Sequence, residues 1–171
     1  MMLGDILHVA IRTADLRTTV GFYCDALGLK EVVRPAGLRF PGAWLALPHA
    51  GDKAVIHVYA LQAAQKHNDQ VVADIEQGSV DHVAFRARGF AAYRTRLQEL
   101  GLTFREQHLD GGTIWQLFVH DPNGVKLELS FNQSEETDLP VSISDTHRYV
   151  ASEDFYDPSE YERFDIVKAS D

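Results

Sequence analysis

The chain has 171 residues, of which 45% are hydrophobic and 24% are charged, values that are ordinary for a globular domain. Its net charge of −9 comes almost wholly from residue 132 onward, where eleven acids and three Lys or Arg leave residues 1–131 at −1. A basic patch, an apolar run of membrane-spanning length and a signal-peptide pattern are all missing from the sequence, so we expect neither nucleic acid nor a membrane as a partner.

The first half of the chain predicts one helix and four strands in the order βαβββ. Alternating apolar and polar side chains indicate the strands, and an apolar stripe indicates the helix, which Thr13 or Asp15 can cap and Gly28 can end. This helix carries the single cysteine, Cys24, which predicts a buried thiol and a cytoplasmic protein without an internal disulfide. The expected elements are a strand at 6–12, the helix to about residue 27, and strands near 30–34, 43–47 and 54–60.

The second half repeats this order after a polar linker, residues 61–79. The sequence HVAIR at residues 8–12 returns 74 residues later as HVAFR, and each copy leads into a helix that ends in Leu-Gly-Leu. A repeat of fixed period predicts two copies of one structural unit. The expected elements are a strand at 80–87, a helix near 89–100, and strands near 103–109, 113–120 and 125–131, the last two joined by a DPNG turn.

The predicted fold class is therefore α+β. One helix can cover only one face of each small sheet, so two paired βαβββ modules should form a cupped mixed sheet around a concave site. Module 1 is expected at about 5–60 and module 2 at about 80–131, within a domain of residues 1–131. Residues 132–171 form an acidic C-terminal extension, whose five aromatic side chains predict packing against its own domain or a partner subunit.

Candidate metal ligands share the concave face in this arrangement. The apolar side chains of each strand should pack under the helix, which places His8, Arg12 and His82 on the opposite face. His57 lies 49 residues after His8, and Glu128 lies 46 residues after His82, each on the last strand of its module. Imidazole and carboxylate groups suit Fe, Mn, Ni, Zn or Co, and two histidines with one carboxylate are the facial set of non-haem Fe(II). The sequence thus predicts a divalent metal site.

The duplicated modules, the histidine that opens each and the ending DPNGVKLEL resemble the vicinal oxygen chelate superfamily. This superfamily includes glyoxalase I, methylmalonyl-CoA epimerase, the fosfomycin- and bleomycin-resistance proteins and type I extradiol dioxygenases. The resemblance covers about residues 5–131 and implies that His8, His82 and Glu128 bind the metal, with His57 at a variable fourth position. It also implies a small-molecule substrate with vicinal oxygens, which the metal polarises. We further expect a homodimer.

The leading functional hypothesis is an extradiol-type, ring-cleaving dioxygenase that uses Fe(II) on a catechol-like compound. By resemblance, His57 would exchange protons and His108 would hydrogen-bond the substrate, so the expected catalytic residues are these two and Glu128. The tyrosine that such dioxygenases carry on the following strand appears here as Leu117, or as Phe118 if the register slips. The expected substrate-binding residues are Arg12, Tyr59, Trp115 and Gln116, with Trp44 as a further wall residue.

Two alternatives remain open at this point. In a glyoxalase I- or epimerase-like isomerase or lyase, His57 would complete a four-ligand site and Glu128 could act as the base. In a non-catalytic binding protein of the bleomycin-resistance kind, the chain would bind a small molecule without a metal. Oxygen uptake with catechols separates the first hypothesis from the second, and metal analysis separates both from the third.

Overall fold

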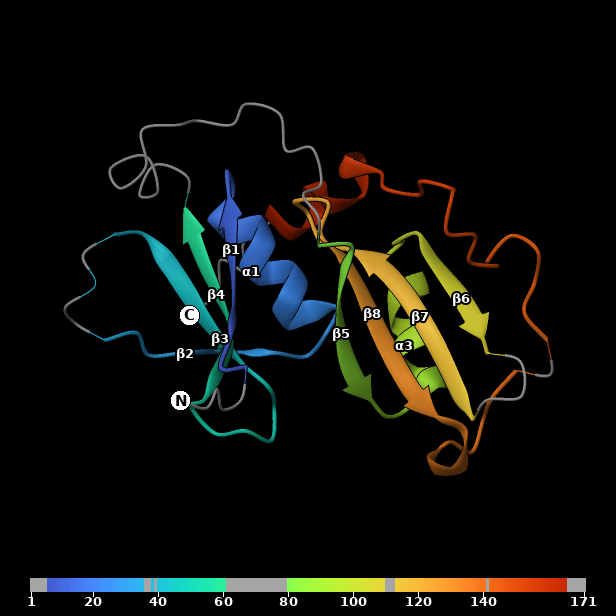
Figure 1. Ribbon diagram of the computed structural model, residues 1–171. Helices are drawn as coiled ribbons and strands as arrows, with labels where there is room; N and C mark the ends of the chain where they lie inside the picture. Colours follow the sequence, from blue (N-terminus) through green and yellow to red (C-terminus); the bar gives the residue numbers. More distant parts are fainter. Residues whose placement is uncertain are drawn as a thin grey trace. The chain divides into compact units, whose positions relative to one another are not determined.

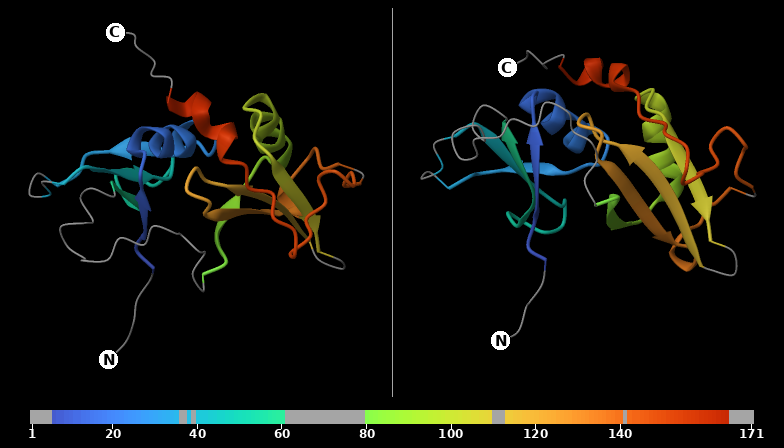
Figure 2. Two further views of the ribbon diagram at one scale, coloured as in Figure 1. Left: turned by 90° about the horizontal axis from the view of Figure 1, so that it is seen from above. Right: turned by 45° about the horizontal axis from the view of Figure 1, so that its top comes forward.

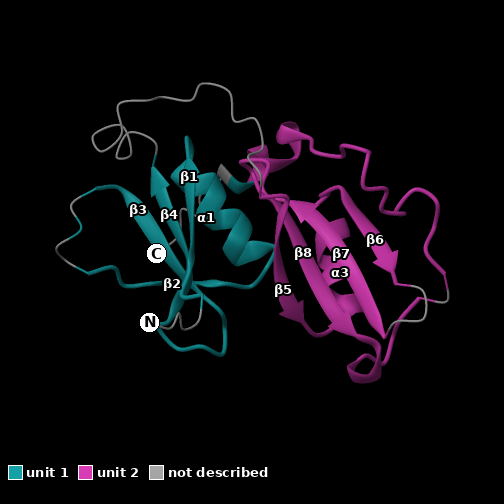
Figure 3. Cartoon of the chain, viewed as in Figure 1, with its two compact units in different colours: residues 1–74, 164–171 teal, residues 75–163 magenta. Residues whose placement is uncertain are grey.

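The computed structural model divides into two compact units (Figure 3), unit 1 with residues 1–74 and 164–171, and unit 2 with residues 75–163. The predicted linker, residues 61–79, lies outside the described part of the chain. Within that part, no helix is long and apolar enough to cross a membrane. The structure describes residues 6–35, 38, 40–60, 80–109, 113–140 and 142–165.

Unit 1 is a four-stranded mixed sheet with one helix against one face (Figure 1). The strand order is β1-β4-β3-β2, with β1 parallel to β4 and the other neighbours antiparallel. Asp15 caps the helix by accepting the Thr18 N–H at 3.0 Å, and Gly28 adopts a φ of 74° just after its end. The predicted βαβββ order is confirmed as β1 Val9–Thr13, α1 Leu16–Asp25, β2 Lys30–Val32, β3 Gly42–Ala46 and β4 Ala54–Ala60.

The core of unit 1 fixes which side chains face the candidate site. Leu45, Ile56 and Val58 of the sheet and Phe22 and Tyr23 of α1 are at most 1% exposed. Burying side chains of this size contributes about 1.5–3 kcal/mol each, so the strand register is strongly determined. Because strand side chains alternate, the residues between these apolar positions must lie on the face away from α1.

Unit 2 repeats the architecture with the strand order β5-β8-β7-β6, again with a single parallel pair, β5 and β8. Its helix α3 lies against one face of the sheet (Figure 2). The turn before β8 is the predicted one, because Gly124 N–H donates to the Asp121 carbonyl at 3.0 Å and Gly124 has a φ of 78°. The elements are β5 His82–Ala87, α3 Phe90–Glu99, β6 Phe104–His108, β7 Ile114–His120 and β8 Lys126–Asn132.

The C-terminal extension, residues 132–171, contributes residues to unit 2 beside β6 (Figures 1 and 2). Glu106 N–H donates to the His147 carbonyl at 2.5 Å, and Tyr149 N–H donates back to the Glu106 carbonyl at 2.9 Å. The Tyr161 hydroxyl donates to the His120 carbonyl at 2.5 Å. The two backbone hydrogen bonds of Glu106 add a short parallel bridge beside β6, the edge strand of the sheet. The extension also forms two 3-10 helices, η1 Gln133–Glu135 and η2 Pro158–Asp165.

Candidate metal and catalytic site

The two modules place their candidate ligands at equivalent positions of the sheet. In unit 1, His57 of β4 pairs with Ala10, two residues after His8. In unit 2, Glu128 of β8 pairs with Ala84, two residues after His82. The backbone registers of the two modules therefore match at these positions. In both units the face that carries these residues is the one away from the helix, because alternate residues of β4 and β8 form the apolar core.

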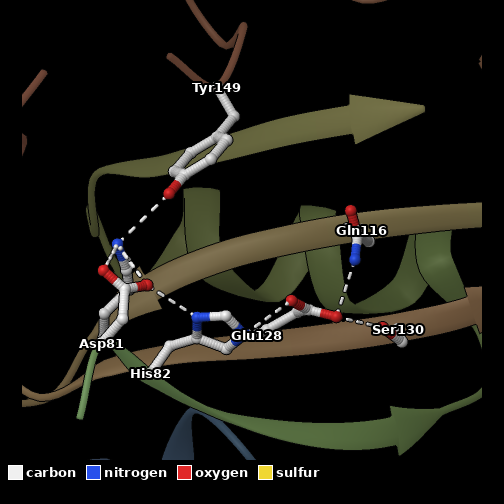
Figure 4. A network of polar contacts seen from close by, with 7 residues as sticks. Asp81, His82, Gln116, Glu128, Ser130 and Tyr149 are labelled. Atoms are coloured by element: carbon white, nitrogen blue, oxygen red, sulfur yellow. Dashed lines mark hydrogen bonds and ion pairs between the residues drawn. The ribbon is translucent and has the colours of Figure 1, made fainter. Parts of the chain in front are cut away.

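In unit 2, His82 and Glu128 lie side by side (Figure 4). His82 Nε2 is 3.1 Å from Glu128 Oε2. The other carboxylate oxygen, Oε1, accepts hydrogen bonds from Gln116 Nε2 at 2.7 Å and from Ser130 Oγ at 2.5 Å. Glu128 is 8% exposed, and these neutral donors satisfy one oxygen while the second stays beside the imidazole. Its position is thus fixed from two neighbouring strands.

The other nitrogen of His82 is held by a chain of polar contacts that ends in the C-terminal extension (Figure 4). His82 Nδ1 donates to Asp81 Oδ1 at 2.7 Å. Lys126 Nζ donates to both Asp81 oxygens, at 2.9 and 3.1 Å, and lies 3.2 Å from the Tyr149 hydroxyl. The hydrogen bonds from His82 and Lys126 hold the pKa of Asp81 below its usual range. A hydrogen bond from Nδ1 to Asp81 leaves Nε2 as the nitrogen that can bind a metal.

In unit 1, His57 is sandwiched between two other rings. The His8 ring stacks on it at a centroid distance of 3.8 Å, and the Trp44 ring stacks at 4.2 Å. Burial lowers the pKa of His57, and the neighbouring His8 and Arg34 lower it further. At pH 7 His57 is therefore neutral, which is the form of imidazole that binds a metal or accepts a proton.

Imidazole and carboxylate side chains, the donor types of the four candidate ligands, suit a divalent metal ion. Two donors about 2.1 Å from one metal and at right angles lie about 3 Å apart, which agrees with the separation of His82 Nε2 from Glu128 Oε2. Within the described part of the chain, no group of three or more His, Cys, Asp or Glu side chains is arranged to hold a metal ion. His8 and His57 belong to unit 1, whereas His82 and Glu128 belong to unit 2. The fit to a metal therefore rests on the pair in unit 2 and on the donor chemistry of unit 1.

The predicted substrate-binding residues divide between the two faces of the sheets. Arg12 and Tyr59 pair with each other across β1 and β4, on the same face as His57. Gln116 lies on the face that carries Glu128, where it donates to that carboxylate. Trp115 and His108 pair on the opposite face, where their rings stack and Trp115 packs edge-on against Phe90 of α3.

The two positions that could correspond to the dioxygenase tyrosine also lie on opposite faces of the sheet. Phe118 is the residue directly opposite Glu128, and Leu117 is fully buried on the helix side. Neither side chain carries a hydroxyl.

Four residues of the polar network were not among the predicted site residues. Lys126 and Ser130 alternate with Glu128 along β8, so their face was predictable although their contacts with Asp81 and Glu128 were not. Asp81 directly precedes the repeated histidine, a position that could have indicated a carboxylate partner. Tyr149 lies outside the repeat, and no pattern in the sequence links it to β8.

The family assignment follows from comparison with known proteins. The chain is 26% identical over 129 residues to "Glyoxylase I 4" of Arabidopsis thaliana, a match that covers 74% of this chain and 70% of the relative. It is 29% identical over 136 residues to "Probable lactoylglutathione lyase" of Synechocystis sp., covering 77% and 98%.

A solved glyoxylase/bleomycin resistance protein/dioxygenase domain from Frankia sp. EAN1pec has the same fold. Its TM-score is 0.58 at 23% identity, and the match covers 77% of this chain and 93% of that one. Residues 5–129 match the model of one protein family. The chain belongs to the Glyoxalase/Bleomycin resistance protein/Dioxygenase superfamily.

Proposed function

We propose that this protein is a divalent-metal-dependent lyase or isomerase of the glyoxalase kind, acting on a small molecule with two neighbouring oxygens. The observation that carries the proposal is the His82–Glu128 pair at 3.1 Å, with its equivalent His8–His57 pair in the other module. The proposed ligands are His8, His82 and Glu128, with His57 as the fourth. The names of the Arabidopsis and Synechocystis relatives, a glyoxylase and a lactoylglutathione lyase, favour the same class.

This choice departs from the extradiol dioxygenase hypothesis for a structural reason. That hypothesis assigns substrate contacts to His108 and to a tyrosine on the following strand. His108 lies on the helix side of the sheet of unit 2, and Phe118 stands opposite Glu128 without a hydroxyl. The residues that the resemblance assigns to ring cleavage are thus missing from the Glu128 face of β6 and β7, whereas the candidate ligands His82 and Glu128 lie side by side on the Glu128 face.

The roles of the residues follow from their contacts. A divalent metal would act as a Lewis acid on the two substrate oxygens. Glu128 is suited to accept a proton from the carbon next to a substrate carbonyl and to return it to the neighbouring carbon, because Gln116 and Ser130 hold its other oxygen. Arg12, Tyr59 and Trp44 share the face of His57 and are proposed to contact the remainder of the substrate.

The test is an activity panel on the full chain loaded separately with Ni, Co, Zn, Mn or Fe(II). The panel contains glutathione hemithioacetals of 2-oxoaldehydes, the chemistry that the name of the Synechocystis relative indicates, and catechols with oxygen uptake as the second readout. We expect isomerisation without oxygen consumption. Glu128→Gln should lower kcat/KM by about 100-fold or more, as expected for loss of a general base or a metal ligand.

Two results would overturn the proposal. Oxygen uptake with a catechol in the Fe(II) protein would restore the dioxygenase hypothesis. Binding of a small molecule that is unchanged in His82→Ala, by a protein that takes up none of the five metals, would instead indicate a non-catalytic binding protein.

A further inference from the structure

Tyr149 of the C-terminal extension lies on the same face of the unit 2 sheet as Glu128. Its ring stacks on Phe118 at a centroid distance of 4.0 Å and an interplanar angle of 16°. Phe118 is the direct cross-strand neighbour of Glu128. The family match ends at residue 129, so Tyr149 lies outside the matched residues.

The backbone explains how a residue so far along the chain reaches this position. Residues 147–149 form a parallel bridge beside β6, with Arg148 paired to Glu106. Arg94 of α3 donates to the buried Glu106 carboxylate at 2.7 Å, which anchors the same strand on its other face. The bridge holds the backbone of Tyr149 beside β6, and from there its ring packs on Phe118 of β7.

The Tyr149 hydroxyl is one end of a continuous chain of polar contacts. Lys126 Nζ lies 3.2 Å from this hydroxyl and donates to both oxygens of Asp81. The ammonium also lies 5.6 Å from the centre of the Tyr149 ring, within cation–π range. Asp81 accepts from His82 Nδ1 at 2.7 Å, and His82 Nε2 faces Glu128 at 3.1 Å.

Each contact in this chain restricts the rotation of the next side chain. Asp81 has a side chain that is 67% exposed, so its carboxylate would rotate in solvent without a second partner. Lys126 supplies that partner, and the side chain of Lys126 is itself 11% exposed because Tyr149 and the sheet enclose it. An Asp81 carboxylate held in this way fixes both the tautomer and the ring orientation of His82.

We propose that Tyr149 and Lys126 are positioning residues of the site: acting through Asp81, they hold His82 so that Nε2 faces Glu128. The C-terminal extension then supports the two proposed metal ligands of unit 2, His82 and Glu128. This inference rests on the proposed function, because it assumes that His82 and Glu128 are ligands.

The test is metal affinity, measured by calorimetric titration of the full chain with Zn²⁺ or Ni²⁺, beside thermal unfolding of the metal-free protein. Asp81→Asn should weaken binding by about 10- to 100-fold, the usual effect of losing a partner of a metal-bound histidine. Tyr149→Phe keeps the ring stack and removes only the hydroxyl, so a loss of about two- to tenfold is expected. Lys126→Met keeps the aliphatic stem and should fall between the two.

The matched control is Tyr156→Phe, which removes another hydroxyl of the same extension, one that donates to the Pro122 carbonyl at 2.8 Å. It should lower the melting temperature and leave the metal affinity at the wild-type value. Metal affinities of Asp81→Asn and Tyr149→Phe equal to that of Tyr156→Phe would overturn this inference alone, provided that His82→Ala and Glu128→Ala lose binding. If His82→Ala and Glu128→Ala also keep wild-type affinity, the proposed function itself is wrong.

Discussion

At the scale of single residues, the difference between the modules matters more than their likeness. His57 and Glu128 occupy equivalent positions of the two sheets, yet one is a stacked imidazole and the other a hydrogen-bonded carboxylate. An imidazole kept neutral by burial binds a metal without adding charge, whereas a carboxylate adds one negative charge and can also act as a base. The proposed chemistry depends on this asymmetry.

His120, at the end of β7, gives a prediction about pH and stability. It is 6% exposed beside the rings of Phe155 and Tyr156, and burial lowers its pKa. The charge of Asp154 partly offsets the effect of burial, and Lys126 lowers the pKa again. The unfolded chain therefore binds a proton more readily than the folded one does. The free energy of unfolding should be highest above the unfolded pKa of about 6.5 and should fall as pH drops through the lower folded value.

The measurement is urea unfolding of wild type and His120→Gln between pH 5 and 8, with His49→Gln as an exposed control. The His120 variant should show a flatter fall in the free energy of unfolding below about pH 6.5 than either of the others. Three parallel curves would contradict the assignment of this pH dependence to His120.

The sequence could predict the candidate ligands but not all of their neighbours. The repeat and the strand alternation were enough to predict the four candidate ligands, because both place a residue on a face of the sheet without reference to its contacts. These ligands are His8, His57, His82 and Glu128. His108 shows where this reasoning stops. Ring stacking with Trp115 under α3 is a tertiary contact, and the alternation of a short polar strand does not reveal it.

At the scale of elements, the β1–β4 and β5–β8 parallel pairs determine the site, because each brings the first and last strand of a module together. Apolar alternation made the strands of the described residues predictable, and apolar stripes did the same for α1 and α3. The contribution of the C-terminal extension was not predictable in detail, because its packing depends on individual hydrogen bonds rather than on a period. Two of its acids, Glu136 and Glu160, accept hydrogen bonds from backbone N–H groups of unit 2.

Glu136 provides a prediction for the start of α3. The cap residue Gly89 has no side chain, and the Glu136 carboxylate accepts the N–H groups of Gly89 and Phe90 at 2.9 and 2.7 Å. Glu136→Ala should therefore lower the free energy of unfolding by about 1 kcal/mol, through loss of a cap and of a favourable charge at a helix N-terminus.

Glu135→Ala is the matched control, because Glu135 forms an exposed ion pair with Arg88 and its loss should change the free energy of unfolding by about 0.5 kcal/mol or less. Chemical denaturation of both variants checks this difference. Equal losses would show that the extension does not cap α3.

At the scale of the whole molecule, a duplicated module accounts for both the fold and the distribution of the candidate ligands. The family match over residues 5–129 covers the two modules, and the extension adds its own contacts to unit 2. The homodimer and the cytoplasmic location stay predictions from the sequence. Sequence patterns do not identify the substrate, because the side chains around the site select it by shape, whereas the patterns indicate only the candidate metal ligands.

The most direct test of the central claim is the stoichiometry and affinity of metal binding in wild type, His8→Ala, His82→Ala and Glu128→Ala, with His49→Ala as the control. The proposal predicts one divalent ion per chain. Each of the three ligand variants should lose more than about 100-fold in affinity, because loss of a ligand should exceed the 10- to 100-fold effect of losing a partner of a ligand. Wild-type affinity in His8→Ala together with loss in His82→Ala would contradict a ligand set drawn from both modules.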